Sequence, residues 1–122
     1  MRRFLLYVHT GRRAALRAML TVLEELRRRG VRAVVVDEQV DEILSLPEDE
    51  APPRLLTFLT NGGVDVLDAV SAADAVELGI VLGGDGTILR ALEAVREADI
   101  PVHGVNLGHV GFLAESEVED LS

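Results

Sequence analysis

The chain has 122 residues, of which 48% are hydrophobic and only 3% aromatic, and its formal net charge at pH 7 is −9. This length is close to that of one small domain, and the composition predicts an aliphatic core. The chain contains no cysteine, which excludes disulfides and thiolate-bound zinc.

Membrane and nucleic-acid partners are not expected. No apolar run approaches the roughly 20 residues of a membrane span, and the run after Arg2 and Arg3 is too short for a signal peptide. Most of the 12 basic residues lie between Arg2 and Arg32, mainly on one predicted helix, without the aromatic platforms of a nucleic-acid binder. We therefore expect a cytoplasmic protein with a solvated, arginine-rich helix face.

The beginning of the chain predicts a strand, a helix and a second strand. Residues 3–9 (RFLLYVH) form a short apolar run that ends at Thr10 and Gly11, which is typical of a buried strand. The next apolar residues recur at helical spacing as far as Gly30, a typical helix stop, and the β-branched residues 31–36 predict another strand. Such a unit implies parallel strands covered by helices.

The rest of the chain continues this alternation less regularly. The predicted elements are an acidic turn of helix (37–44), a strand or helix (54–60), a turn (61–63), a loop or short helix (69–75), a buried strand (78–82), a helix with Ile88, Leu89, Leu92 and Val95 on its apolar side, and a last strand (about 100–106). The predicted fold class is α/β: a doubly wound, mostly parallel sheet with helices on both faces.

The segment LGGDGTILRA, residues 82–91, places a glycine turn between a predicted strand and a predicted helix. In open parallel sheets, ligands bind outside the carboxyl ends of the strands, where helix N-termini point outward. Gly83, Gly84 and Gly86 can adopt conformations closed to other residues and let backbone N–H groups approach phosphate oxygens. Thr87 suits the helix N-cap or can bond a phosphate. Neither GxGxxG nor GxxxxGK[ST] is present, so the dinucleotide fingerprint and the P-loop both lack their motif.

Asp85 lies in the middle of this turn, where its negative charge would repel a phosphate. The acid makes chemical sense if the ligand carries its own cation, or if a hydroxyl there must lose a proton. Both conditions apply when a hydroxyl attacks a Mg²⁺-nucleotide. The alternative is that Asp85 only stabilises a turn. Arg90 follows in the same helix, either as a ligand contact or as an ordinary exposed charge.

The motif GGDGT (83–87), followed by GVNLGHVGFLAE (104–115), closely resembles the NAD kinase family. The pairing is specific, because GGDGT alone also occurs in diacylglycerol and sphingoid-base lipid kinases and a similar GGDGS occurs in phosphofructokinases. The opening VHTGRR (8–13) is also similar to the first strand and turn of bacterial NAD kinases, especially actinobacterial ones.

The resemblance implies an activity and a set of site residues. The γ-phosphate of ATP, or in some members inorganic polyphosphate, would pass to the 2′-hydroxyl of the adenosine ribose of NAD⁺, with Mg²⁺ or another divalent cation as cofactor. Asp85 would be the proton acceptor, and Phe112 would line the adenine side of the pocket. The metal ligands stay unassigned. The nucleotide-binding residues would be Gly83, Gly84, Asp85, Gly86, Thr87, Arg90, Asn106 and Phe112, with Gly108, His109 and Gly111 in the loop of the last two.

Members of the family continue into a β-rich C-terminal domain that carries an Asn-Glu/Asp motif gripping NAD. We therefore expect residues 1–122 to be the N-terminal nucleotide-binding and catalytic domain, inactive alone, of a protein that is a homo-oligomer at full length. One alternative is a lipid kinase, which would call for an apolar surface that the sequence does not show. The other is a non-catalytic nucleotide-binding module.

Each histidine could have either a structural role or a role in the functional site. His109 could serve as an acid or electrostatic aid, but the glycines around it favour a loop-positioning or packing role. His103 is expected in the core or at the edge of the last strand. His9, Thr10 and Gly11, at the end of the first strand, either line the same crevice as the glycine turn or form a simple turn.

Overall fold

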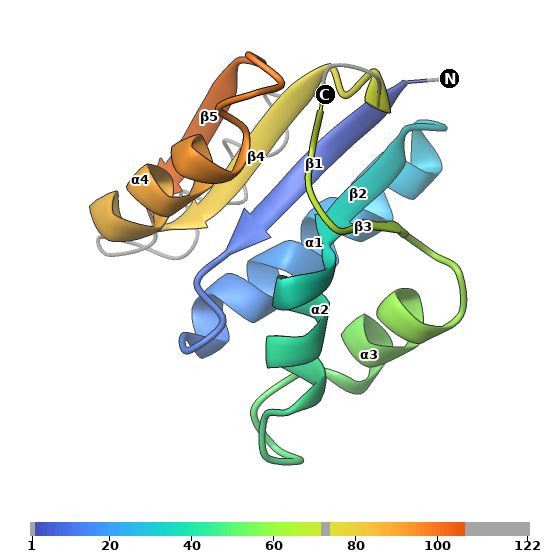
Figure 1. The fold of residues 1–122 in the computed structure, drawn as a ribbon. Helices are drawn as coiled ribbons and strands as arrows, with labels where there is room; N and C mark the ends of the chain where they lie inside the picture. The colour runs from blue at the N-terminus through green and yellow to red at the C-terminus, as the bar shows by residue number, and fades with distance from the viewer. Residues whose placement is uncertain (1, 72–73, 107–122) are drawn as a thin grey trace.

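The computed structural model describes residues 2–71 and 74–106, which form a five-stranded sheet in the order β3-β2-β1-β4-β5 (Figure 1). Every strand pair is parallel. The elements in chain order are β1 (Arg3–Val8), α1 (Arg13–Arg28), β2 (Arg32–Val36), α2 (Asp37–Leu44), α3 (Pro53–Thr60), β3 (Asp65–Leu67), β4 (Leu78–Gly83), α4 (Asp85–Ala94) and β5 (Val102–Asn106).

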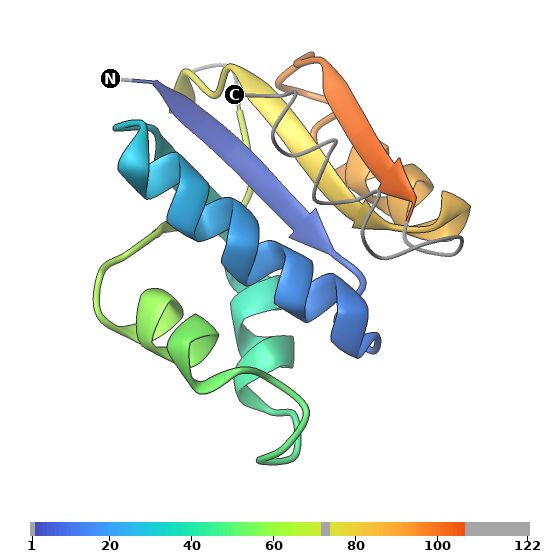
Figure 2. The ribbon, with the colours of Figure 1, turned by 180° about the vertical axis from the view of Figure 1, so that it is seen from behind.

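Helices cover both faces of this sheet. In Figure 1 α4 lies in front of β4 and β5, and in Figure 2, turned by 180°, α1 lies in front of β1. Successive residues of β1 point to opposite faces, so Leu6 packs with α1, α2 and α3 while Leu5 packs on the side of α4. The predicted α/β fold, with a parallel sheet and helices on both faces, is confirmed. In the described part, no helix is long and apolar enough to cross a membrane.

The central strands are apolar along almost their whole length because both of their faces are covered. After its first residue, β1 is buried throughout, and so are β2 and β4. Parallel sheets covered on both faces give such continuous apolar runs, which is why the sequence predicted these strands correctly apart from their end residues. The predicted helix over 37–44 is also confirmed, as α2.

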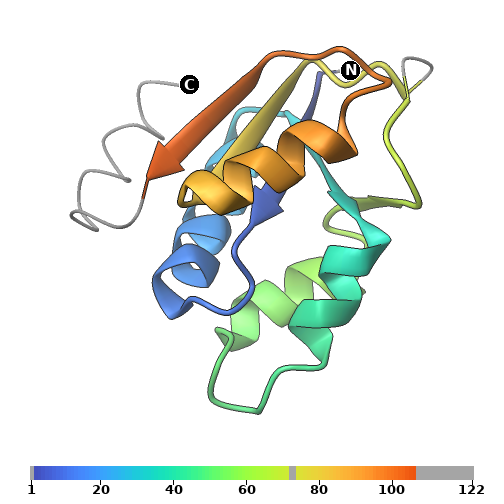
Figure 3. The same ribbon diagram turned by 60° about the vertical axis from the view of Figure 1, so that its left-hand side comes forward.

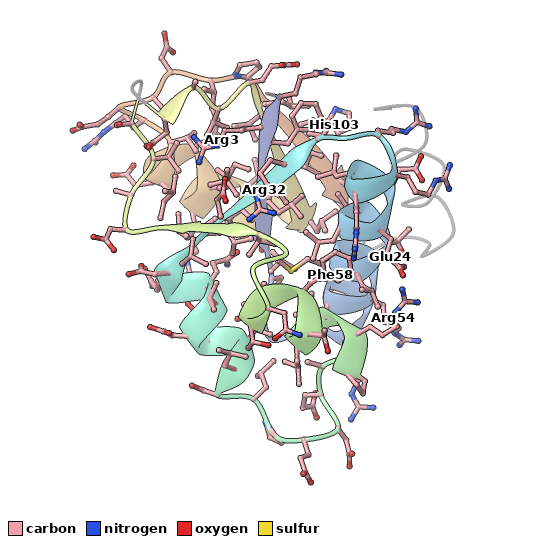
Figure 4. All side chains as sticks on the ribbon, turned by 90° about the vertical axis from the view of Figure 1, so that its right-hand side faces the viewer. Arg3, Glu24, Arg32, Arg54, Phe58 and His103 are labelled. Carbon is pink, nitrogen blue, oxygen red and sulfur yellow. The ribbon has the colours of Figure 1, made fainter. Side chains whose placement is uncertain are left out.

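The segment that fitted either a strand or a helix is the helix α3. Pro53 occupies its first turn, where the missing N–H needs no partner, and Leu55 and Leu59 are buried one turn apart. An ion pair between Arg54 and Glu24 of α1 ties the two helices together on their outer side (Figure 4). The local sequence of this segment is compatible with a strand or a helix, and its packing on α1 favours the helix.

The short strand β3 was not predicted from the sequence. It spans only three residues, none of them buried, and it pairs with β2 at the edge of the sheet. Its first residue, Asp65, accepts hydrogen bonds from Arg32 Nε at 2.8 Å and from Arg3 at 3.3 Å, two arginines at the starts of β2 and β1 (Figure 4). These ion pairs join β3 to residues distant in the sequence, which no run of buried apolar residues in this segment could have indicated.

The helix predicted from Ile88, Leu89, Leu92 and Val95 is confirmed as α4, but not all of these apolar residues are buried. Leu89 is 67% exposed and Leu92 is 45% exposed, whereas Ala91 is buried against the sheet. Ile88 approaches β5 so closely that a Cβ added at Gly104 would lie 2.6 Å from its Cδ1 atom. Small residues at the contact bring the helix near the sheet and turn the two leucines outward.

The carboxyl end of β1 is held by a side chain of α2. Gln39 is only 4% exposed, although it is polar. Its Oε1 accepts the N–H of Val8 at 2.8 Å, and its Nε2 donates to the Val8 carbonyl at 2.7 Å. The amide thus satisfies both backbone groups of Val8 on the side away from β4, where a neighbouring strand would otherwise do so.

Replacing Gln39 by Met should lower the free energy of unfolding by about 2–6 kcal/mol, because two buried backbone groups lose their partners at about 1–3 kcal/mol each. Urea unfolding followed by circular dichroism measures the loss. Asp41→Met, on the exposed side of the same helix, is the control and should change stability by less than about 0.5 kcal/mol. Equal effects of the two variants would contradict the role assigned to Gln39.

Candidate functional site

The strand order reverses its direction between β1 and β4. From β1 the chain builds outward through β2 and β3, and from β4 it builds to the other side through β5. Figure 3 shows that α4 begins close to the ends of β4 and β5. Ligands of doubly wound proteins bind in the crevice at such a reversal, outside the carboxyl ends of the strands.

The glycine turn lies at this reversal. The His9 N–H donates to the Leu82 carbonyl at 2.9 Å, which extends the pairing of β1 with β4 by one bond. On the other side Gly83 is paired with Asn106, the last residue of β5. His9 and Asn106 therefore flank Gly83 on the two neighbouring strands, so residues from three separate segments meet at one edge.

Gly83 is needed because there is no room for a side chain. A Cβ built on it would lie 2.7 Å from Thr87 Oγ1 and 3.1 Å from His9 Cβ. Thr87 is buried at 8% exposure, and α4 begins before it, at Asp85, with Gly84 as N-cap. The prediction of Thr87 as N-cap is therefore wrong, because its side chain packs on Gly83 instead.

Gly84 and Gly86 have open space where a side chain would begin. Apart from the adjoining residues and the backbone of α4 itself, no described atom lies within 4 Å of the position that a Cβ would take on either residue. The glycines of this turn do not use the left-handed conformations open to them, since positive φ among the described glycines occurs at Gly30 and Gly62. What the two glycines leave instead is uncovered backbone at the start of α4, where helical N–H groups have no partner within the helix.

The Asp85 side chain is exposed and forms no hydrogen bond or ion pair within residues 2–71 and 74–106. It does not cap α4, because the N-cap residue is Gly84 and no side chain bonds to the first turn. Its structural contribution is limited to a favourable interaction with the helix dipole, typically about 0.3–1 kcal/mol. The carboxylate is thus available to a ligand.

Arg90 lies on the same helix, and its charge reaches Tyr7 of β1. Burial raises the pKa of the Tyr7 hydroxyl, the positive charge of Arg90 opposes that rise, and Glu38 and Glu42 of α2 add to it. Arg90 itself is exposed and has no hydrogen bond or ion pair to any residue that the structure describes. Arg90 therefore lies near enough to Tyr7 for its charge to act on that hydroxyl.

Of the remaining candidate site residues, only some lie in the part of the chain that the structure describes. Phe112, Gly108, His109 and Gly111 lie outside the described residues. His103 pairs with Ile80 on the edge strand β5 and is half-buried, as expected, and its Nε2 has no hydrogen-bond partner in the described part. Among the described residues, no group of three or more histidines and acids could hold a metal ion.

A groove of about 510 Å³ lies elsewhere, at the amino ends of β2 and β3. Arg27, Arg32 and Phe58 are among the residues that line it, and Figure 4 shows the last two on that side of the molecule. None of the candidate site residues contributes to this groove. It lies at the opposite end of the strands from the glycine turn.

Sequence reasoning missed the residues of α2 that support the site. Gln39 holds Val8, and Glu42 accepts the hydroxyl of Thr10 at 2.7 Å. Both lie in an acidic segment without a motif, and their role depends on a contact between segments about thirty residues apart in the chain. No local pattern could have indicated it.

A glycine-rich turn at the reversal point of a parallel sheet is typical of nucleotide-binding α/β proteins. The family model "ATP-NAD kinase N-terminal domain" matches residues 4–122, and the chain belongs to this family. It is 46% identical over 121 residues to the NAD kinase of Thermobifida fusca, covering 99% of this chain and 34% of that protein. With the NAD kinase of Leifsonia xyli the identity is 47% over 120 residues, covering 98% and 36%.

The fold is also similar to that in the crystal structure of yeast NADH kinase complexed with NADH. The TM-score is 0.63 at 19% sequence identity, and the match covers 99% of this chain and 35% of that one. The chain spans about a third of the length of the curated relatives it matches.

Replacing Gly83 by Ala should destabilise the fold, whereas replacing Gly86 by Ala should not. The added methyl group at Gly83 meets Thr87 and His9, and such overpacking costs about 1–3 kcal/mol. At Gly86 the space is open and alanine is the better helix former, so stability should stay equal or rise by up to about 1 kcal/mol. Thermal unfolding of both variants checks this. A larger loss from Gly86→Ala than from Gly83→Ala would refute it.

Proposed function

We propose that this chain is the nucleotide-binding and catalytic N-terminal domain of an NAD kinase, which transfers the γ-phosphate of ATP to the 2′-hydroxyl of the adenosine ribose of NAD⁺. The observation that carries the proposal is the Asp85 carboxylate. It is exposed, it begins a helix beside uncovered glycine backbone, and it has no partner among the described residues. Membership of the ATP-NAD kinase family supports the same reaction.

Asp85 acts as the base in this proposal. Its carboxylate accepts the proton of the 2′-hydroxyl while the hydroxyl oxygen attacks the γ-phosphorus, and the bond from that phosphorus to the β,γ-bridging oxygen breaks to release ADP. The uncovered backbone of Gly84 and Gly86 would donate N–H groups to phosphate oxygens. Arg90, exposed on the helix that begins at Asp85, would contact the nucleotide by a charge-assisted hydrogen bond.

Mg²⁺ or another divalent cation is proposed as the cofactor. Mg²⁺ is usually held by one or two carboxylates together with substrate phosphates, so such an ion would need no cluster of acids. Asp85 would hold it only if its carboxylate served as a ligand instead of as the base, and the metal ligands stay unassigned. When bound, the ion would neutralise charge on the phosphates. The donor is proposed to be ATP, with inorganic polyphosphate as an alternative donor.

The rest of the NAD⁺ site is proposed from the family resemblance. Asn106, which the sheet register places beside Gly83, and Phe112 would bind the adenosine half of NAD⁺. A β-rich C-terminal domain would supply the second wall of the cleft, in a cytoplasmic homo-oligomer. Nucleic acid and membrane are not proposed as partners.

A lipid kinase is the second candidate, and one observation favours it. Leu89 and Leu92 are exposed on α4, directly after the glycine turn, where an apolar acceptor would find a surface. Offering the full-length protein ATP with NAD⁺ or with diacylglycerol separates the two. Phosphorylation of diacylglycerol without formation of NADP⁺ would replace the proposed function.

Asp85→Asn should lower turnover of the full-length protein by about 10²–10⁴-fold, because it removes the base and keeps the size of the side chain. The melting temperature should stay nearly unchanged, since Asp85 bonds to no described residue. NADP⁺ formation measured by a coupled assay gives the turnover, and Glu93→Gln on the same helix is the control. Near-normal turnover would leave Asp85 as a turn residue.

Arg90→Ala should raise the apparent nucleotide KM about ten- to a hundredfold, because a hydrogen bond to a charged group contributes about 1.5–3 kcal/mol in ground and transition states alike. Arg96→Ala, at an exposed position whose ion pair is with Glu93, is the matched control and should leave KM unchanged. If both variants have the same nucleotide KM as the parent protein, Arg90 is a solvent-exposed charge that does not contact the nucleotide.

Residues 1–122 alone should form no measurable NADP⁺ from NAD⁺, ATP and Mg²⁺. Holding donor and acceptor in line is worth about 7–11 kcal/mol, and most of it is lost when one wall of the cleft is missing. We also expect this piece to self-associate through apolar surface meant for the second domain. Turnover within tenfold of the full-length protein would show that residues 1–122 carry a complete site.

A further inference from the structure

The side chain of His9 is fixed at the edge of the glycine turn. Its backbone N–H donates to the Leu82 carbonyl at 2.9 Å, so the residue is tied to the strand that leads into the turn. Its Cβ atom would lie 3.1 Å from a Cβ built on Gly83. His9 is nevertheless exposed, and it stands on the opposite side of Gly83 from Asn106.

The imidazole ring is oriented by the turn that follows it. The N–H of Gly11 donates to His9 Nδ1 at 3.2 Å, so Nδ1 carries no proton and the neutral ring has its hydrogen on Nε2. Within the described part of the chain, Nε2–H has no acceptor. The ring therefore keeps one hydrogen-bond donor, Nε2–H, that no described residue uses.

The neighbouring Thr10 faces a different way. Its hydroxyl donates to Glu42 Oε2 of α2 at 2.7 Å, so this hydroxyl hydrogen is already used. Of the two polar side chains in the turn, His9 alone keeps an unused donor. An N–H donor beside uncovered glycine backbone suits a phosphate oxygen, which only accepts hydrogen bonds.

We propose that His9 binds the phosphate chain of the phosphoryl donor, with Nε2–H donating to a non-bridging phosphate oxygen. This inference rests on the proposed function. It adds to that function a residue that binds the phosphoryl donor. Asp85, at the start of α4, receives the acceptor hydroxyl. The donor phosphates then lie at the N–H groups of Gly84 and Gly86, next to the end of β1 where His9 stands.

Two substitutions of His9 in the full-length protein separate phosphate binding from turn stabilisation. His9→Asn keeps an acceptor for the Gly11 N–H and loses the distal donor, whereas His9→Gln keeps a distal donor and loses the acceptor close to the backbone. We expect His9→Asn to raise the KM for ATP about tenfold or more, with the KM for NAD⁺ within about twofold, and His9→Gln to have the smaller effect.

Two results of this comparison would overturn the proposal. A larger defect in His9→Gln than in His9→Asn means that the side chain only stabilises its turn. A rise confined to the KM for NAD⁺ places His9 on the acceptor's pyrophosphate instead. If His9→Asn does not fold, His9→Ala replaces it, and His9→Gln must then have the lower KM for ATP.

Direct binding of Mg²⁺-ATP, measured by calorimetry on the same proteins, separates this inference from the proposed function. If the parent protein forms no NADP⁺ but His9→Asn binds ATP about tenfold more weakly than the parent, the proposed function fails and the role of His9 stands. Equal ATP affinity in parent and variant, or no ATP binding by the parent, overturns the role of His9.

Discussion

The end of β1 is held in place by the amide of Gln39 rather than by a neighbouring strand. Because β1 is the central strand, its last residue determines where the crevice at the sheet reversal begins. Val8 bonds to Gln39 on one side, and the next residue bonds to Leu82 on the other. The position of the glycine turn therefore depends on a buried polar contact from α2, a helix that carries none of the proposed catalytic groups.

Some residues of the glycine turn are packed against the rest of the structure, and the others are exposed. Gly83 and Thr87 fit against each other and have no free space, while Gly84, Asp85 and Gly86 contact little of the described structure. A catalytic carboxylate, the role proposed for Asp85, needs a rigid support and an open face. In this chain the support comes from β4 and from the buried side of α4, and the open face is the first turn of that helix.

The sequence predicted the parts of the molecule that local patterns determine. Continuous apolar runs predicted β1, β2 and β4, and the motif at residues 83–87 was expected at a strand end that opens a helix, where the structure places it. The short strand β3 escaped prediction because it has only three residues, none fully buried, and depends on its pairing with β2 and on long-range ion pairs of Asp65. The outward turn of Leu89 follows from the close approach of Ile88 to Gly104, and no periodicity encodes that contact.

A crystal structure of the full-length protein with NAD⁺ and a non-hydrolysable ATP analogue tests the central claim most directly. We predict the ribose 2′-hydroxyl within hydrogen-bond distance of the Asp85 carboxylate, about 2.6–3.2 Å, and donor phosphates at the N–H groups of Gly84 and Gly86. Nucleotide bound away from this edge, for example in the groove lined by Arg27 and Phe58, would contradict it.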